Sequence, residues 1–72
     1  MYIYHYDFNG LRNLEELYLE QNSLESIQEQ SFEKLKKLKT LKLNTNYLRS
    51  LGADTFVGLG ELELLDLSTN EL

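Results

Sequence analysis

Residues that could carry out chemistry are few and scattered in this 72-residue sequence. There is no cysteine and only one histidine, His5, so neither a thiolate nucleophile nor the usual zinc ligand set can be assembled. Twelve acidic side chains are present, but none stands in an apolar stretch that would tune it for acid–base catalysis. Gly58-Leu59-Gly60 is too short for a phosphate loop, and no nucleotide-binding or metalloprotease motif occurs. The sequence therefore predicts no enzyme, no cofactor and no metal site.

The charge balance limits the classes of partner. Twelve acidic against seven basic side chains give a net charge of -5, which disfavours nucleic acid or an anionic lipid surface. No stretch approaches the roughly 20 apolar residues of a membrane span. Residues 1–8 also lack the basic start and apolar run of a signal peptide. We expect no nucleic-acid partner and no direct membrane insertion in this segment.

The apolar residues coincide when the sequence is shifted by 24 positions, and the chain length equals three such periods. The aligned sets are Leu14, Leu38 and Leu62; Leu17, Leu41 and Leu65; Leu19, Leu43 and Leu67; Asn22, Asn46 and Asn70; Leu24, Leu48 and Leu72; Ile3, Ile27 and Leu51; Phe8, Phe32 and Phe56; and Leu11, Leu35 and Leu59. The register divides the chain into 1–13 (the end of a preceding repeat), the repeats 14–37 and 38–61, and 62–72 (the start of another).

Within each period, leucines two residues apart predict a short strand with the leucines inward and the residues between them outward. One such strand cannot bury its apolar face alone, so successive coils must stack with their strands parallel. The recurring asparagine, as in Asn46, follows the strand, where a buried amide can hydrogen-bond the turn and the neighbouring coil.

The other half of each coil returns the chain to the next strand. Its apolar spacing of five and then three, Ile27, Phe32 and Leu35, favours an irregular or short helical wall, with Phe8, Phe32 and Phe56 stacked as a spine. Residues 31–39 also fit an amphipathic helix of no more than about one or two turns.

These residues resemble the leucine-rich repeat family, and within it the 24-residue "typical" class found in the ectodomains of slit-like proteins, Toll-like receptors and small leucine-rich proteoglycans. Residues 14–72 match the 24-residue pattern L-x-x-L-x-L-x-x-N-x-L-x-x-L-x-x-x-x-F-x-x-L-x-x at every consensus position. The resemblance implies an α/β solenoid with short parallel strands on a concave face and an irregular or short helical convex return. It also implies protein recognition on the concave face and an extracellular or cell-surface location. The chain departs from the class at Gln28 and Gly52, where proline is often found, and in having no cysteine-rich caps.

The outward strand positions are the predicted partner-binding surface. They form three columns: Glu16, Thr40 and Leu64; Tyr18, Lys42 and Asp66; and Glu20, Asn44 and Ser68. Tyr18 and Leu64 are the expected anchors, because aromatic or apolar side chains on a polar sheet are typical of interfaces. Opposite charges, such as Lys42 and Asp66, or Lys39 between Glu15 and Glu63, are placed to interact across neighbouring strands. The alternative for any single residue is ordinary solvent-exposed surface.

The ends of the sequence leave the function open among three classes. Tyr2, Tyr4 and Tyr6 around Ile3, with His5 between them, form either a binding lip or an atypical edge that covers the first coil. The repeat register is incomplete at both ends, so we expect a fragment of a longer array. The hypotheses are a recognition module of a larger receptor or adhesion protein, a structural or self-associating scaffold piece that stacks through uncapped ends, and a targeting arm for an enzyme elsewhere in a longer chain.

Overall fold

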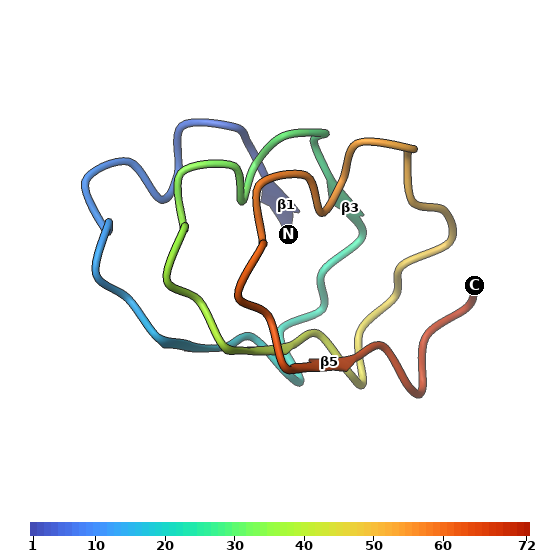
Figure 1. Cartoon of the computed structure of the whole chain (residues 1–72). Coiled ribbons are helices and arrows are strands. Elements are labelled where there is room, and N and C mark those ends of the chain that lie inside the picture. The colour runs from blue at the N-terminus through green and yellow to red at the C-terminus, as the bar shows by residue number, and fades with distance from the viewer.

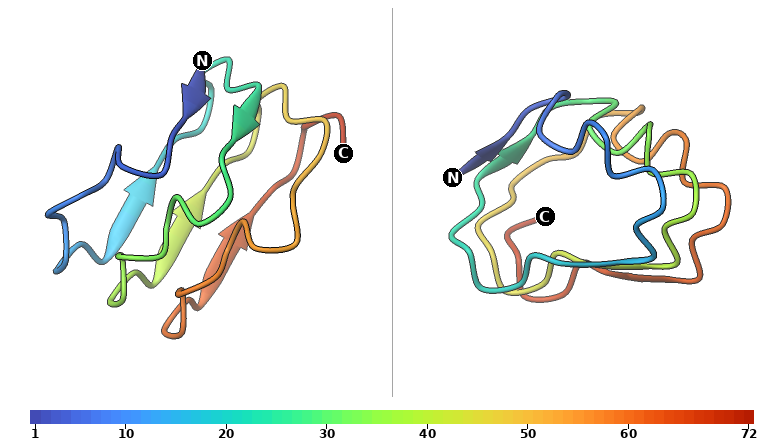
Figure 2. Two further views of the ribbon diagram at one scale, coloured as in Figure 1. Left: turned by 90° about the horizontal axis from the view of Figure 1, so that it is seen from above. Right: turned by 90° about the vertical axis from the view of Figure 1, so that its left-hand side faces the viewer.

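The computed structural model describes residues 1–72 and contains five short strands and no helix. They are β1 (Tyr2–Ile3), β2 (Glu16–Tyr18), β3 (Ser26–Ile27), β4 (Thr40–Lys42) and β5 (Leu64–Asp66). β2, β4 and β5 form one sheet in that order, and β1 pairs with β3 in a second sheet. The chain winds through successive coils that lie side by side (Figure 1), and each coil adds one strand to the larger sheet (Figure 2, left).

Strand register follows the repeat. Leu41 of β4 pairs with Leu17 of β2 and with Leu65 of β5, and every pairing is parallel. Each coil therefore advances the chain by one strand and 24 residues, which is the arrangement of a solenoid-like repeat. Viewed from the side, the coils nearly superimpose (Figure 2, right).

The return half of the coil contains turns and no helix, so of the two predicted forms of this wall the irregular one is found and the short helical one, with residues 31–39 as a helix, is not. The backbone bonds there join residues three apart: Leu35 N donates to Phe32 O at 3.0 Å, and Leu38 N donates to Leu35 O at 3.2 Å. The three side chains that these turns carry, Phe32, Leu35 and Leu38, are all fully buried. Successive tight turns therefore provide the backbone hydrogen bonds of this wall and also bury its apolar side chains.

The second sheet is a feature that the sequence pattern did not predict, since the pattern assigned this wall no strand. Ile3 pairs with Ile27, and both side chains are buried. No backbone hydrogen bond joins residues 25–28 to residues 49–52, so this sheet ends at β3.

Burial is concentrated in the middle of the stack. The core consists of Ile3, Leu24, Ile27, Phe32, Leu35, Leu38, Leu41, Leu43 and Leu48. The equivalent residues of the outer coils are less covered: Leu41 is 0% exposed, but Leu65, one coil later, is 39% exposed. A coil is fully enclosed only when another coil lies on each side of it.

The chain leaves each strand of the larger sheet through a left-handed residue. Gln21, Thr45 and Thr69 have φ values of 58°, 59° and 55°. This conformation is costly for a β-branched threonine. Its recurrence at the position before each asparagine shows that the turn geometry is imposed by the repeat and not by the residue type.

Candidate functional site

The larger sheet brings the predicted columns together. Glu16 pairs with Thr40, which pairs with Leu64, and Tyr18, Lys42 and Asp66 are in register in the same way. The third column, Glu20, Asn44 and Ser68, follows the strands. Backbone bonds at this end of the sheet, from Gln21 N to Asn44 O at 3.3 Å and from Thr45 N to Ser68 O at 3.0 Å, hold its members on adjacent coils. We call these nine residues the strand face.

Tyr18 is exposed but held in place. Its side chain is 52% exposed, and its hydroxyl donates a 2.9 Å hydrogen bond to the Glu16 carboxylate. Lys42 Nζ lies over the ring, 6.0 Å from its centroid, at the limit of a cation–π contact. The bond to Glu16, with desolvation and the negative charges of Glu16 and Glu20, raises the pKa of the Tyr18 hydroxyl above its usual value. The ring is therefore oriented before any ligand binds.

Asp66 is also oriented by its neighbours. Its carboxylate accepts hydrogen bonds from Ser68 Oγ at 2.7 Å and from Ser68 N at 3.0 Å. These bonds, aided by the positive charge of Lys42, lower the pKa of Asp66 below its usual value. Lys42 acts on Asp66 at a distance, because no direct ion pair joins the two.

Charge pairs on the strand face are weaker than the sequence suggests. Neither Lys42 with Asp66 nor Lys39 with the carboxylates beside it forms an ion pair. The two ion pairs lie on the opposite wall, from the Met1 amino group to Glu25 at 3.6 Å and from Arg49 to Glu71 at 2.9 Å.

Two further residues of the strand face, Leu64 and Asn44, differ from their neighbours in exposure and hydrogen bonding. Leu64, at the start of β5, is 45% exposed and lies two strands from β2. Asn44 donates only a long 3.4 Å bond to Thr45 Oγ1, and its enclosed Oδ1 has no hydrogen-bond partner. Tyr18 and Leu64 are separated by two strand spacings across the sheet and two residues along it, about 12 Å between their Cα positions, on an otherwise polar surface.

The repeated asparagines form a ladder behind the strand face. Asn46 Oδ1 accepts from Asn22 N and Leu24 N, both at 2.9 Å, and its Nδ2 donates to Leu19 O at 2.9 Å and Leu43 O at 3.0 Å. Asn70 repeats the pattern one coil later, with Leu48 N and with Leu43 O, both at 3.0 Å. The side chain of Asn22 bonds only Glu20 O of its own coil. Each asparagine after the first therefore connects two coils.

The three phenylalanines stack along the other wall. Ring centroids are 5.7 Å apart from Phe8 to Phe32 and 6.1 Å apart from Phe32 to Phe56. The sequence pattern did not identify the buried hydroxyls that precede two of these rings. Ser31 Oγ donates to Gln28 O, and Thr55 Oγ1 donates to Gly52 O at 3.0 Å. Their 24-residue spacing was the signal that could have identified them.

The N-terminal aromatic residues stand outside the core. Ile3 is 2% exposed, but Tyr4 and Tyr6 remain largely exposed and stack with ring centroids 6.0 Å apart. His5 interacts with Gln28 through its backbone N and its ring Nδ1, both 2.9 Å from Oε1. Only Ile3 of these four residues joins the core, and no group of three potential metal ligands exists.

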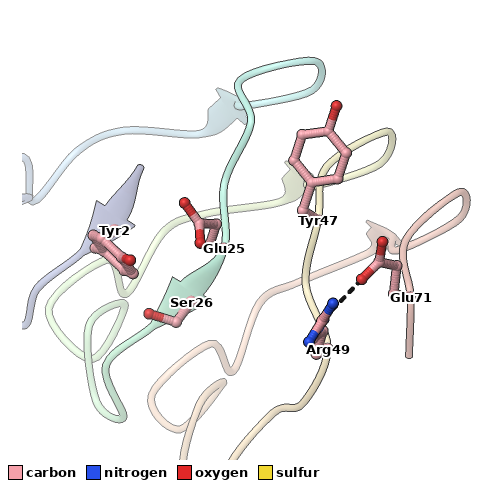
Figure 3. Close-up of a pocket in the computed structure, with 6 residues that line it drawn as sticks. All are labelled: Tyr2, Glu25, Ser26, Tyr47, Arg49 and Glu71. Atoms are coloured by element: carbon pink, nitrogen blue, oxygen red, sulfur yellow. Dashed lines mark hydrogen bonds and ion pairs between the residues drawn. The ribbon is translucent and has the colours of Figure 1, made fainter.

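A hollow of about 560 Å³ lies on the wall of the second sheet, away from the predicted site. It is lined by Tyr2, Glu25, Ser26, Tyr47, Arg49 and Glu71 (Figure 3). Its position follows from the absence of backbone pairing between β3 and residues 49–52. Because Arg49 is already paired with Glu71, the hollow presents no free basic group to a ligand.

Comparison with known proteins supplies the family. A model described as "Leucine rich repeat" matches residues 8–72. No curated protein and no solved structure matches the chain. The structure contains no helix long and apolar enough to cross a membrane. The matched region contains β2 to β5 and the asparagine ladder, and this chain therefore belongs to the leucine-rich repeat family.

Proposed function

We propose that this chain is a protein-binding module that recognises its ligand on the strand face, as part of a larger receptor or adhesion protein at or outside the cell surface. Leucine-rich repeat domains are commonly protein-interaction modules and are typically not enzymes. We assign the chain to the 24-residue class on the period of its register. One observation supports this binding site most directly: Tyr18 is an exposed aromatic side chain, and a hydrogen bond to Glu16 holds it in place.

The orientation of Tyr18 by Glu16 lowers the entropic cost of binding a ligand. A tyrosine that is already fixed loses little conformational freedom on binding, and tyrosine is enriched among the residues that dominate interface energies. Leu64 supplies a second apolar contact on the same surface. The polar residues around them suit the rim of an interface, where water is excluded from the central contacts.

The charge of the strand face indicates the chemistry of the ligand. Glu16, Glu20 and Asp66 are acidic, and Lys42 is the only basic member. Complementarity favours a protein surface on which basic side chains surround an exposed apolar residue. Association should therefore slow as salt is added, because charge attraction between surfaces mainly accelerates encounter.

Site-directed photo-crosslinking tests the site and captures the ligand in one experiment. A photoreactive phenylalanine analogue is placed at position 18, on the strand face, or at position 34, where exposed Lys34 lies on the return turns. The proposal expects a specific protein adduct from position 18 only. The captured protein is then purified and its affinity is measured directly.

Affinity measurements on the captured ligand complete the test. Tyr18→Ala should weaken binding by about 1 kcal/mol or more, and Lys34→Ala should leave it unchanged. Tyr18→Phe, which keeps the ring but loses the bond to Glu16, should lie between them. Equal losses for Tyr18→Ala and Lys34→Ala, or adducts from both positions, would contradict recognition on the strand face.

A further inference from the structure

The turn from Phe8 to Leu11 contains the only Asn-Gly pair of the chain. Leu11 N donates to Phe8 O at 3.3 Å, so Asn9 and Gly10 are the two central residues of the turn, and Gly10 has a φ of +89°. The bond that closes a β-turn uses the N–H of its last residue and not that of its third. The N–H of Gly10 donates to no other group of the chain. The backbone nitrogen that follows Asn9 is therefore free to react.

The surroundings of Asn9 belong to its position in the repeat. Asn9 is exposed, and its equivalents are Glu33, which is only half-buried although a coil lies on each side of it, and Val57, which is 43% exposed. Gly58, the equivalent of Gly10, has a φ of +92° and lies against the backbone of Glu33. The N–H of Gly58 is nevertheless not a donor. A coil packed on the preceding side of this turn thus leaves both the side-chain position and the glycine N–H free.

The other five asparagines lack this combination. In four of them the N–H of the following residue donates a backbone hydrogen bond; these are the N–H groups of Leu14, Thr45, Tyr47 and Glu71. In the fifth, Asn22, the side-chain Nδ2 donates to Glu20 O at 3.1 Å, and the following residue is serine. The side chain of Asn9 forms no hydrogen bond, in contrast to those of Asn22, Asn44, Asn46 and Asn70. Only Asn9 joins a free side-chain amide to a free N–H of glycine.

We propose that Asn9 is a site of spontaneous deamidation in the folded chain. The Gly10 nitrogen loses its proton and attacks Asn9 Cγ, the bond from Cγ to Nδ2 breaks, and the leaving nitrogen takes up a proton and departs as ammonia. The product is a cyclic imide. Water then adds to one of the two imide carbonyl carbons and breaks its bond to the Gly10 nitrogen. Opening at Cγ gives aspartate, and opening at the backbone carbon gives isoaspartate. Water is the only co-reactant.

Glycine favours this reaction for a steric reason. The absence of a Cβ at Gly10 lets the side-chain carbonyl carbon of Asn9 approach the nitrogen, and it leaves the backbone free to adopt the geometry of the ring. The middle coil has Lys34 at this position, and its φ is not positive. The turn of the first coil is therefore the one that meets both the chemical and the conformational requirement.

The two products differ in their effect on the fold. Both carry a new carboxylate, which adds one negative charge to a chain of net charge -5. Aspartate leaves the backbone unchanged, whereas isoaspartate lengthens it by one carbon between Phe8 and Leu11. That segment is closed by the 3.3 Å bond from Leu11 N, and it positions the Phe8 ring, 5.7 Å from that of Phe32. The isoaspartate form should therefore melt at a lower temperature than the aspartate form.

Incubation of the folded 72-residue chain in mildly alkaline buffer, followed by peptide mapping with mass spectrometry, tests the proposal. An isoaspartate-specific methyltransferase distinguishes the two products. We expect both products at position 9, at a rate that rises with pH because the attacking nitrogen must lose its proton, and none at the other five asparagines. A parallel sample in urea, where the backbone hydrogen bonds are lost, should also react at Asn22. An unmodified position 9 in the folded chain would overturn the proposal, whether or not the chain in urea reacts. Equal reaction at all six asparagines of the folded chain would also overturn it.

Two pairs of variants test the roles of the turn and of glycine. Gly10→Ala should slow product formation about 10-fold or more, and Asn9→Gln should abolish it. Val57→Asn creates the same pair in the equivalent turn of the last coil and should react at position 57, whereas Glu33→Asn, followed by Lys34, should not. Circular dichroism establishes that each variant retains the wild-type spectrum. Equal rates for Val57→Asn and Glu33→Asn, or no product at position 57, would contradict the role assigned to this turn.

Discussion

Removal of the Asn46 side chain should be among the most damaging single changes in this chain. The residue is 5% exposed, and its amide bonds groups in two coils. Asn46→Ala leaves three of those groups without a partner: Leu24 N, Asn22 N and Leu19 O. Leu43 O keeps a partner, because Asn70 Nδ2 also donates to it at 3.0 Å.

The expected cost follows from the burial of these groups. Leu24 is fully buried, so its orphaned N–H should cost about 2 kcal/mol, whereas Asn22 N and Leu19 O lie nearer to water and should cost about 1 kcal/mol each. The total of about 4 kcal/mol is comparable to the whole stability of a small domain, about 0.05–0.15 kcal/mol per residue. The Asn46→Ala variant should therefore unfold at a much lower urea concentration than the parent chain.

Urea denaturation followed by circular dichroism measures the free energy of unfolding. Asn70→Ala, which orphans the N–H of Leu48, should cost about 2 kcal/mol, and Asn22→Ala should cost less than about 1 kcal/mol. Asn44→Ala is the control within the same coil and should be nearly neutral. Equal costs for Asn22→Ala and Asn46→Ala would refute the reasoning, because they would assign the effect to the local turn and not to bonds between coils.

Three further predictions concern the turns and the strand face. Gly58 has φ of +92°, and a Cβ there would lie 2.6 Å from a backbone oxygen of the preceding coil, so Gly58→Ala should destabilise by more than about 1 kcal/mol. Gly60→Ala, with nothing within 4 Å, is the control and should be neutral or slightly stabilising in the same denaturation assay. Thr45→Asn should raise the thermal midpoint, because asparagine tolerates the left-handed φ of 59° better than threonine; a lower midpoint would show that the turn is not strained. The hydrogen bond to Glu16 raises the pKa of Tyr18 in the folded chain, so its contribution to stability is present below the unfolded value of about 10 and is lost as pH rises through the folded value. An NMR titration should show the Tyr18 pKa falling toward 10.0 in Glu16→Gln, and an unchanged pKa would argue against that bond.

The sequence alone determines the register of this protein. A period of 24 residues with alternating leucines leaves one arrangement in which Leu17, Leu41 and Leu65 all face inward, and the parallel pairing of β2, β4 and β5 follows from it. Register is predictable because a shift of one residue would move every leucine of a strand to the wrong face. The same periodicity placed the columns of the strand face in order.

The tertiary structure determines the features that the 24-residue period does not specify. The three-residue spacing of Phe32, Leu35 and Leu38 fits a helical turn as well as a series of tight turns, and only the fit of these side chains into a shared core selects the turns. The β1–β3 sheet, the hollow beside it and the bond from Tyr18 to Glu16 depend on the distance between coils and on side-chain rotamers. Residues of one repeat type, such as Leu41 and Leu65, differ in exposure because a coil is buried by its neighbours and not by its own sequence.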